Sequence, residues 1–277
     1  MKPVAFDIVR PRTTEEAVKL LSSPTSGARV VAGSQSLGPM LNLRLVQPQI
    51  LCDITGIEAL TSFVEEKDAL VVGASVTTGC IEDRRLPSNG FAMLPDVAAG
   101  IAYRAIRNRG TIGGSVCHAD PAADWPSALC GLNASCVIAG PGGSRRTLPI
   151  SEFITGAFEN DLKQGELLVG IRIPRQSPET KWGYQKLCRK TGEFASAIAV
   201  VNIDRDRGLF RLVFGATEGR HLVIPDFRVL CEVGQSAPSR AAVRNVLNEA
   251  RVSSARVSQQ IAMMQRAFSQ AGVQCEN

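Results

Sequence analysis

The chain has 277 residues, enough for two or three compact units of roughly 100–200 residues each. Hydrophobic residues make up 44% and charged residues 21%, as in ordinary globular proteins, and no uncharged run approaches the ~20 residues needed to cross a bilayer. The net charge of +5 is modest, and the basic residues cluster no further than pairs, so the sequence carries no electrostatic footprint for nucleic acid.

The first 60 residues predict a small α/β unit. After an extended start through Pro11, Thr13–Glu16 has the pattern of a capping box, and the apolar residues that follow give one face of a helix ending near Ser22. Two β-branched runs, Ala28–Ala32 and Ile50–Ile54, predict strands separated by a second helical stretch. Strand, helix and strand in this order indicate a small α/β unit.

Residues 61–176 predict a second, α+β unit, whose elements are separated by turns rich in glycine and proline. In chain order the expected elements are a strand at Leu70–Ala74, helices at Thr77–Leu86 and Phe91–Ala102, and strands at Ser135–Ala139, Arg146–Ile150 and Leu167–Ile173. A polar stretch with two prolines, Pro174–Lys181, follows, and we place the next boundary there.

Residues 177–277 predict a C-terminal domain in which helices accompany an antiparallel sheet. Gly183–Cys188, Phe194–Ile203 and Leu209–Phe214 are expected to form a meander. Two amphipathic helices follow, and their apolar stripes, within 241–247 and 257–268, are typical of core faces rather than of a cofactor motif. The expected fold class is therefore α+β, with domains at 1–60, 61–176 and 177–277.

The cysteines and histidines do not predict a metal centre. The eight cysteines are scattered without a Cys-x-x-Cys pair, and most lie in apolar surroundings, as buried small hydrophobes do. Neither a zinc site nor an iron–sulfur cluster is expected, and with only His118 and His221 a histidine-based site is not expected either. The segment Met1–Asp7 lacks the apolar region of a secretory signal, so we expect a cytoplasmic protein.

One short segment, Ile106–Trp125, gathers glycines, hydroxyl groups and cations in the second unit. Its glycines let the main chain come close to a ligand, its hydroxyl groups can bond to that ligand, and its arginines can supply positive potential. Asp124 is the acceptor best placed to meet a sugar hydroxyl or a ring N–H. The segment predicts a cradle for a phosphate-bearing cofactor; the residues concerned are Gly110, Gly113, Gly114, Thr111, Ser115, Arg107 and Arg109.

A second loop of the same composition lies upstream, at Val31–Pro39. A single glycine-rich loop is most often a plain turn, because short glycine motifs recur widely. Two such loops in one chain, each beside an apolar run, favour a split site that holds a diphosphate. This interpretation requires that the two loops meet in space.

These motifs resemble those of the flavin-binding medium subunit of molybdenum hydroxylases, the family of the carbon monoxide dehydrogenase medium subunit and the xanthine dehydrogenase flavin domain. The matching blocks are Ala32–Pro39, with Arg44 and Asp53 after it, then Arg107–Ser115 and Ala119–Asp124. The resemblance implies a two-subdomain FAD-binding fold of the vanillyl-alcohol oxidase/PCMH type, followed by the C-terminal domain.

The resemblance also implies which residues hold FAD. A concave row of backbone N–H groups can bind a diphosphate without a lysine or a helix terminus. The implied cofactor-binding residues are Ala32, Gly33, Ser34, Gln35 and Ser36 in the first loop, Thr111, Gly114 and Ser115 in the second, and Ile101, Asp124, Leu168 and Lys186 around the flavin. Taken alone, Leu168 is also typical of a core residue and Lys186 of a solvated strand, and His118 is expected to be a loop hydrogen-bonding residue rather than a proton donor.

Two features depart from the resemblance. Ser34 stands where relatives often carry glycine, which restricts the backbone conformations open to the first loop. The C-terminal region lacks the Gly-Ser-Ala-x-Tyr-Arg-Arg run common near the end of relatives.

The function implied by the resemblance is electron transfer without a catalytic side chain. FAD held here would take electrons from 2Fe-2S clusters on a small partner subunit and pass them to an external acceptor, while a large molybdopterin subunit hydroxylates the substrate, in a dimer of heterotrimers. Two alternatives stay open: a free-standing FAD-dependent oxidase or reductase, and a non-catalytic nucleotide-binding assembly module.

Overall fold

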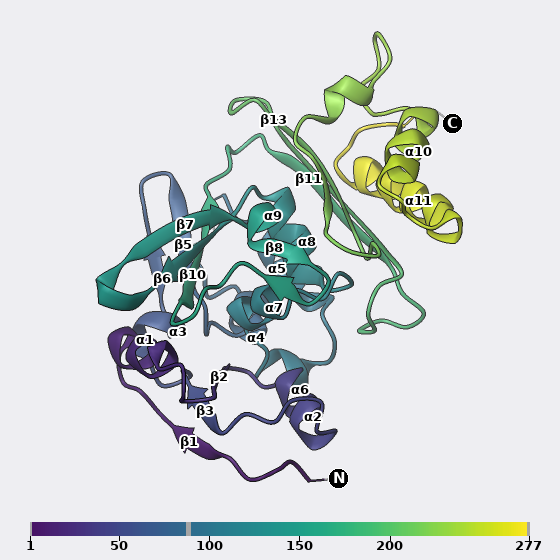
Figure 1. Cartoon of the computed structure of the whole chain (residues 1–277). Helices are drawn as coiled ribbons and strands as arrows, with labels where there is room; N and C mark the ends of the chain where they lie inside the picture. The colour runs from purple at the N-terminus through teal and green to yellow at the C-terminus, as the bar shows by residue number, and fades with distance from the viewer. Residues whose placement is uncertain (1, 87–89, 276–277) are drawn as a thin grey trace.

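The computed structural model describes residues 2–86 and 90–275, and it begins with a small parallel sheet (Figure 1). Strands β1 (Asp7–Val9), β3 (Ile50–Asp53) and β2 (Ala28–Val31) lie in that order, with helix α1 (Thr14–Ser22) before β2 and α2 (Leu37–Asn42) between β2 and β3. The predicted strand–helix–strand unit is therefore confirmed.

Helix α1 begins as the capping pattern predicts. The Thr13 hydroxyl accepts a hydrogen bond from the Glu16 amide at 3.2 Å, and the Glu16 carboxylate accepts one from the Arg12 amide at 2.7 Å. These bonds satisfy two backbone donors at the entry to the helix. The helix then buries Ala17, Val18 and Leu21 against the first sheet.

The second sheet is antiparallel, with the order β4-β5-β10-β6-β7. Its central strand, β10, was predicted at Leu167–Ile173 and extends to Pro174. Short helices packed against the sheet form the largest core among the described residues, around Trp125. The elements of this part are α3 (Glu58–Thr61), β4 (Phe63–Glu65), β5 (Ala69–Gly73), α4 (Thr78–Glu82), α5 (Met93–Ala99), α6 (Arg104–Arg107), α7 (Ile112–His118), α8 (Asp124–Gly131), β6 (Ser135–Ala139), the 3-10 turn Pro141–Gly143, β7 (Arg145–Pro149), α9 (Ile150–Phe153), β8 (Ile154–Gly156), β9 (Glu159–Asn160) and β10 (Leu167–Pro174).

The helices of this part differ from the prediction. The first predicted helix ends early because Arg84 adopts a positive φ of 55°, which a right-handed helix cannot continue through. The second predicted helix ends at Ala99, before Ala102, whose φ is 42°. Helices α7 and α8 were not predicted, because α7 contains a Gly-Gly pair of low helix propensity and α8 carries Pro126 in its first turn.

The third sheet confirms the predicted meander. Strands β11 (Lys181–Leu187), β12 (Ala197–Asp204), β13 (Leu209–Gly215) and β14 (Leu222–Ile224) pair antiparallel in chain order. One face of the sheet packs on α8, and α11 (Ser254–Gln270), with α10 (Arg240–Glu249) beside it, covers the other, as the upper right of Figure 1 shows. The remaining element is the 3-10 turn Phe227–Leu230.

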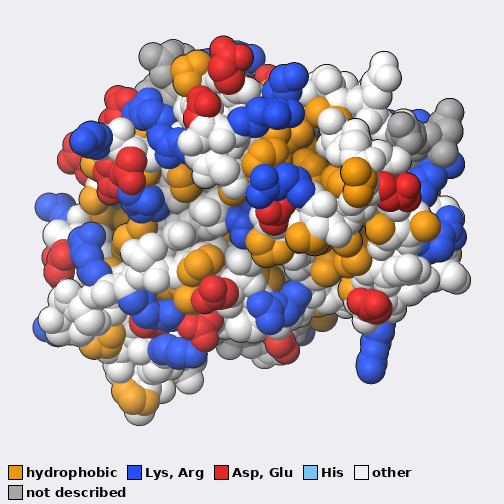
Figure 2. Space-filling model, turned by 90° about the horizontal axis from the view of Figure 1, so that it is seen from above, with side chains coloured by type: hydrophobic (Ala, Val, Ile, Leu, Met, Phe, Trp, Pro, Cys, Tyr) orange, Lys and Arg blue, Asp and Glu red, His pale blue; other side chains and the backbone are white. Residues whose placement is uncertain are grey.

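The three larger sheets and the two-stranded sheet β8-β9 account for the α+β class, and they fall within the three predicted residue ranges. The division at 60/61 and 176/177 stays a prediction, and its outer ends, residue 1 and residues 276–277, lie outside the described residues. On the face shown in Figure 2, acidic and basic side chains are interspersed and neither sign forms a continuous patch. Among the described residues, every helix is too short or too polar to span a bilayer.

Candidate cofactor site

The two glycine-rich loops meet in space. A Cβ atom on Gly33 would lie 2.1 Å from the carbonyl oxygen of Arg109 and 2.8 Å from the Cα of Gly110, so only glycine allows this approach. On the other side of the contact, a Cβ on Gly110 would lie 3.7 Å from the side chain of Gln35. The convergence that the split diphosphate site requires is therefore present.

Both loops line one cavity of about 480 Å³, a size typical of small-molecule sites. All three parts of the chain contribute to its walls, since the connection between β11 and β12, at residues 192–194, lines it together with both loops. Eleven of the twelve predicted site residues line this cavity, and Lys186, the twelfth, binds a residue that does. The eleven are Ala32, Gly33, Ser34, Gln35, Ser36, Ile101, Thr111, Gly114, Ser115, Asp124 and Leu168.

The first loop presents a row of backbone donors. Within the described part of the chain, the amides of residues 33–37 have no hydrogen-bond acceptor, although neighbouring groups such as the amide of Gly38 are paired. Backbone amides in folded proteins are otherwise almost always paired. Ser34 turns the loop with a φ of 61°, and a curved run of unpaired N–H groups is suited to an anion.

The second loop differs from its predicted form as a row of free amides. It is the first turn of α7, and its amides bond within the protein: Gly113 to the Ala74 carbonyl at 3.0 Å, Gly114 to the Thr111 hydroxyl at 3.0 Å and Ser115 to the Thr111 carbonyl at 3.1 Å. What this loop offers to a ligand is the amide of Thr111 and the hydroxyl groups of Thr111 and Ser115.

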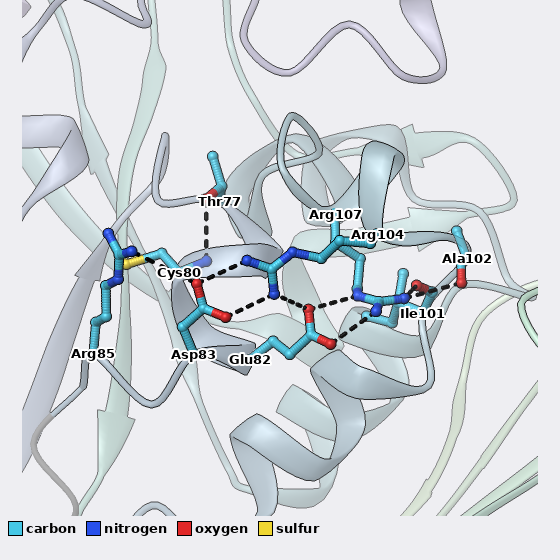
Figure 3. Close-up of polar contacts among 9 residues, drawn as sticks. All are labelled: Thr77, Cys80, Glu82, Asp83, Arg85, Ile101, Ala102, Arg104 and Arg107. Carbon is cyan, nitrogen blue, oxygen red and sulfur yellow. Dashed lines mark hydrogen bonds and ion pairs between the residues drawn. The ribbon is translucent and has the colours of Figure 1, made fainter.

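Arg107 and Arg109 are expected to supply positive potential to a ligand, but the structure places no unpaired guanidinium of these two residues at the cavity. Arg107 lines the cavity, but its guanidinium makes two bonds of 2.8 Å to the Glu82 carboxylate and also donates to the carbonyls of Ile101 and Ala102 (Figure 3). Hydrogen bonds from Arg107 hold the pKa of Glu82 below its ordinary value. Arg109 is exposed and does not line the cavity. Arg107 thus holds the backbone at Ile101 and Ala102.

Asp124 lies at the cavity wall at the start of α8. Its Oδ1 accepts hydrogen bonds from the Tyr184 hydroxyl and the Lys186 ammonium, both at 2.7 Å, and Lys186 also donates to the Gly100 carbonyl at 2.9 Å. Lys186 is therefore largely buried and paired, unlike a solvated strand residue. Tyr184 was not predicted, although the alternation of Trp182, Tyr184 and Lys186 along one strand places the three side chains on one face.

Two further residues considered in the sequence, His118 and Leu168, line the cavity. His118 packs against Phe158 with ring centroids 5.2 Å apart, and burial lowers the pKa of its imidazole. Leu168 is 2% exposed and belongs to the main core while it also lines the cavity; its contact with a flavin stays a prediction. Asn160, Glu193 and Phe194 line the cavity as well, and no sequence motif marked them.

Residues 4–176 match the family described as the FAD binding domain in molybdopterin dehydrogenase. The chain belongs to this family. The caffeine dehydrogenase subunit beta of Pseudomonas sp. (strain CBB1) is 36% identical over 203 residues, which cover 73% of this chain and 69% of that one. The carbon monoxide dehydrogenase medium chain of Hydrogenophaga pseudoflava is 38% identical over 197 residues, covering 71% and 68%.

Solved structures agree over the full length. The carbon monoxide dehydrogenase from Hydrogenophaga pseudoflava that lacks the Mo-pyranopterin moiety matches with a TM-score of 0.88 and 31% identity over 100% of both chains. Quinoline 2-oxidoreductase from Pseudomonas putida 86 matches with a TM-score of 0.84 and 30% identity over 98% of each. The chain is accordingly an FAD-containing oxidoreductase subunit, the medium subunit of a molybdenum hydroxylase.

The cavity fits the cofactor that this membership implies. A diphosphate needs hydrogen-bond donors, and the amides of residues 33–37 supply them in a curved row. Gly33 keeps the wall free of side chain at the point where the two loops touch. Apolar lining from Ile101 and Leu168 suits an aromatic ring system.

We expect Ser34→Gly to stabilise the protein slightly. The φ of 61° at Ser34 is strained for a residue with a Cβ and relaxed for glycine, and the greater entropy of glycine in the unfolded chain offsets part of the gain. We expect a net increase of about 0.5 kcal/mol in the free energy of unfolding, and denaturant unfolding measures this change. A lower free energy of unfolding in Ser34→Gly would show that the Ser34 side chain stabilises the folded protein by more than its backbone strain costs.

We expect Gly114→Val to weaken FAD binding about tenfold, because it displaces the Thr111 hydroxyl from its place in the site. A Cβ at position 114 would lie 2.8 Å from the Thr111 hydroxyl oxygen and would displace the group that caps α7 and faces the cavity. Titration of flavin-free protein with FAD measures the change. Gly219→Val is the control, since that position has open space around it; equal affinities for FAD in the two variants would contradict the prediction.

Proposed function

We propose that this subunit carries electrons from 2Fe-2S clusters on a small partner subunit to an external acceptor, while a large molybdopterin subunit hydroxylates the substrate. The observation that carries the proposal is the meeting of two glycine-rich loops at one cavity lined with unpaired amides, in a chain of the FAD-binding family. FAD, when bound, supplies the exchange between two-electron and one-electron chemistry.

The residues of this chain bind and orient the cofactor. The amides of residues 33–37 and the hydroxyl groups of Thr111 and Ser115 hold the diphosphate, and Ile101 and Leu168 pack against the flavin. Asp124, paired with Lys186, accepts a hydrogen bond at the flavin end of the cavity. No side chain is assigned to acid–base catalysis, since electron transfer through a flavin does not require one here.

The assembly we propose is a dimer of heterotrimers. It is supported by relatives that are named as a medium chain and as a subunit beta, and by full-length structural similarity to a chain of carbon monoxide dehydrogenase. We also propose a cytoplasmic location. All eight cysteines are free thiols, which fits a reducing compartment.

Purification of the protein from its native host, followed by an absorption spectrum and identification of copurifying chains, tests the proposal. We expect flavin absorbance, a molybdopterin subunit and an iron–sulfur subunit, and flavin reduction by the complex's substrate only when all three chains are present. Turnover of a substrate by this chain alone would favour a free-standing oxidase or reductase. A colourless protein that does not take up added FAD would favour an assembly module, and either result would overturn the proposal.

A further inference from the structure

Tyr184 contributes a buried donor to the cavity wall from the C-terminal sheet. Its hydroxyl donates to Oδ1 of Asp124 at 2.7 Å, across 60 residues of sequence. Burial raises the pKa of the phenol, and the negative charge of Asp124 raises it further. The phenol therefore keeps its proton and acts as a hydrogen-bond donor to the carboxylate.

The two oxygens of Asp124 have different surroundings. Oδ1 accepts from both Tyr184 and Lys186, whereas Oδ2 has no hydrogen bond to any described residue. Asp124 is 8% exposed and lines the cavity, so its second oxygen is the atom left for a ligand. Oδ2 is not among the fully buried side-chain atoms, so it is accessible to a donor from a ligand in the cavity.

The chemistry of Asp124 restricts which part of a dinucleotide it can meet. A carboxylate beside a diphosphate would place like charges together, so Asp124 suits a group that carries N–H or O–H donors. FAD has such donors in its ribityl chain and its isoalloxazine ring. Lys186 ties the Gly100 carbonyl to the same carboxylate, which joins Asp124 to the segment that carries Ile101.

We propose that Tyr184 is a positioning residue for the flavin end of the cofactor. By holding Oδ1 of Asp124 together with Lys186, it orients Oδ2 toward the cavity, where that oxygen accepts a hydrogen bond from the ribityl or isoalloxazine portion. This inference rests on the assignment of the cavity to FAD. It gives the C-terminal sheet a part in cofactor recognition through strand β11.

The test uses Tyr184→Phe in the full chain, purified with its copurifying subunits and freed of flavin. Dissociation constants for FAD and for ADP are measured by titration calorimetry, because ADP carries the diphosphate without the flavin or ribityl group. Tyr103→Phe is the matched control, since Tyr103 is the other of the two tyrosines and is 62% exposed. We expect Tyr184→Phe to weaken FAD about tenfold and leave ADP unchanged, and Tyr103→Phe to change neither.

A second pair of variants tests the route through Asp124. If Tyr184 acts only by orienting this carboxylate, adding Tyr184→Phe to Asp124→Asn produces no further loss of FAD affinity. Lys186→Met removes the other donor to Oδ1, and we expect the same selective loss of FAD. It also keeps the inference testable if Tyr184→Phe does not fold.

The outcomes separate this inference from the proposed function. Wild-type affinity for FAD in Tyr184→Phe, or in Lys186→Met, would overturn the positioning role while leaving FAD binding intact. An equal loss of ADP affinity would overturn it as well, because the effect would then extend beyond the flavin end. Absence of FAD binding by the wild-type protein would instead contradict the assignment of the cavity to FAD.

Discussion

Gly33→Val is expected to abolish FAD binding, with a loss of affinity of about a hundredfold or more. The Cβ alone would lie 2.1 Å from the Arg109 carbonyl oxygen, and that obstacle is backbone, which cannot rotate away as a side chain can. The two loops must therefore separate, and the amides of residues 33–37 move away from Thr111 and Ser115 across the cavity. The measurement is flavin content after purification and titration with FAD.

Gly56→Val is the control for this variant. Gly56 lies in the same N-terminal part of the chain, but nothing lies within 4 Å of the position that a Cβ would take. We expect wild-type flavin content there. Normal flavin content in Gly33→Val would show that the loops tolerate separation, and the split diphosphate site would be wrong.

Local patterns in the sequence predicted much of the fold. The capping residues Thr13 and Glu16 lie three positions apart, and a continuous apolar run marks strand β12, so both signals are contained in a short window. Helix α7 could not be found in this way. Its glycines lower the helix propensity of the segment. The helix is stabilised by hydrogen bonds from the amides of Gly113 and Ile112 to the carbonyls of Ala74 and Val76, which follow β5.

The same holds for the site: features within a short stretch of sequence were predicted, and contacts between distant residues were not. The glycine-rich loops identified the cavity, because glycine composition is readable within a few residues. The partners of the charged residues were not readable. Arg107 pairs with Glu82, 25 residues earlier, and Asp124 with Tyr184, 60 residues later. The tertiary fold determines which arginine is paired and which carboxylate is hydrogen-bonded. The motif alone did not predict the pairing of Arg107.

Glu82→Gln is expected to lower the free energy of unfolding by about 2 kcal/mol and to weaken FAD retention. Glu82 also pairs with Arg104 at 2.7 Å, so the substitution weakens two arginine pairs. The side chains of Arg107 and Glu82 are 12% and 19% exposed, so solvent reduces the full cost of breaking a buried pair. Arg107 also holds the carbonyls of Ile101 and Ala102, so a loosened guanidinium disturbs the cavity wall (Figure 3).

The pH dependence of stability tests the pair directly. The pKa of Glu82 is lowered in the folded protein, chiefly by its hydrogen bonds with Arg107, so its contribution is present above the ordinary value of 4.5 and is lost as the pH falls through the folded pKa. Subtracting the Glu82→Gln curve from the wild-type curve isolates this contribution from other carboxylates. We expect the difference to be constant near neutral pH and to shrink in acid below pH 4.5.

Glu66→Gln provides the matched control, since Glu66 pairs with Arg172 at 39% and 32% side-chain exposure. Because solvent screens that pair, we expect Glu66→Gln to lower the free energy of unfolding by less than about 1 kcal/mol and to leave the flavin content unchanged. A similar loss of stability in both variants, or a difference curve for Glu82→Gln that does not change with pH, would show that the Arg107 pair acts as an ordinary surface contact. The geometry favours the opposite result, because Arg107 joins a carboxylate on α4 to the backbone beside Ile101.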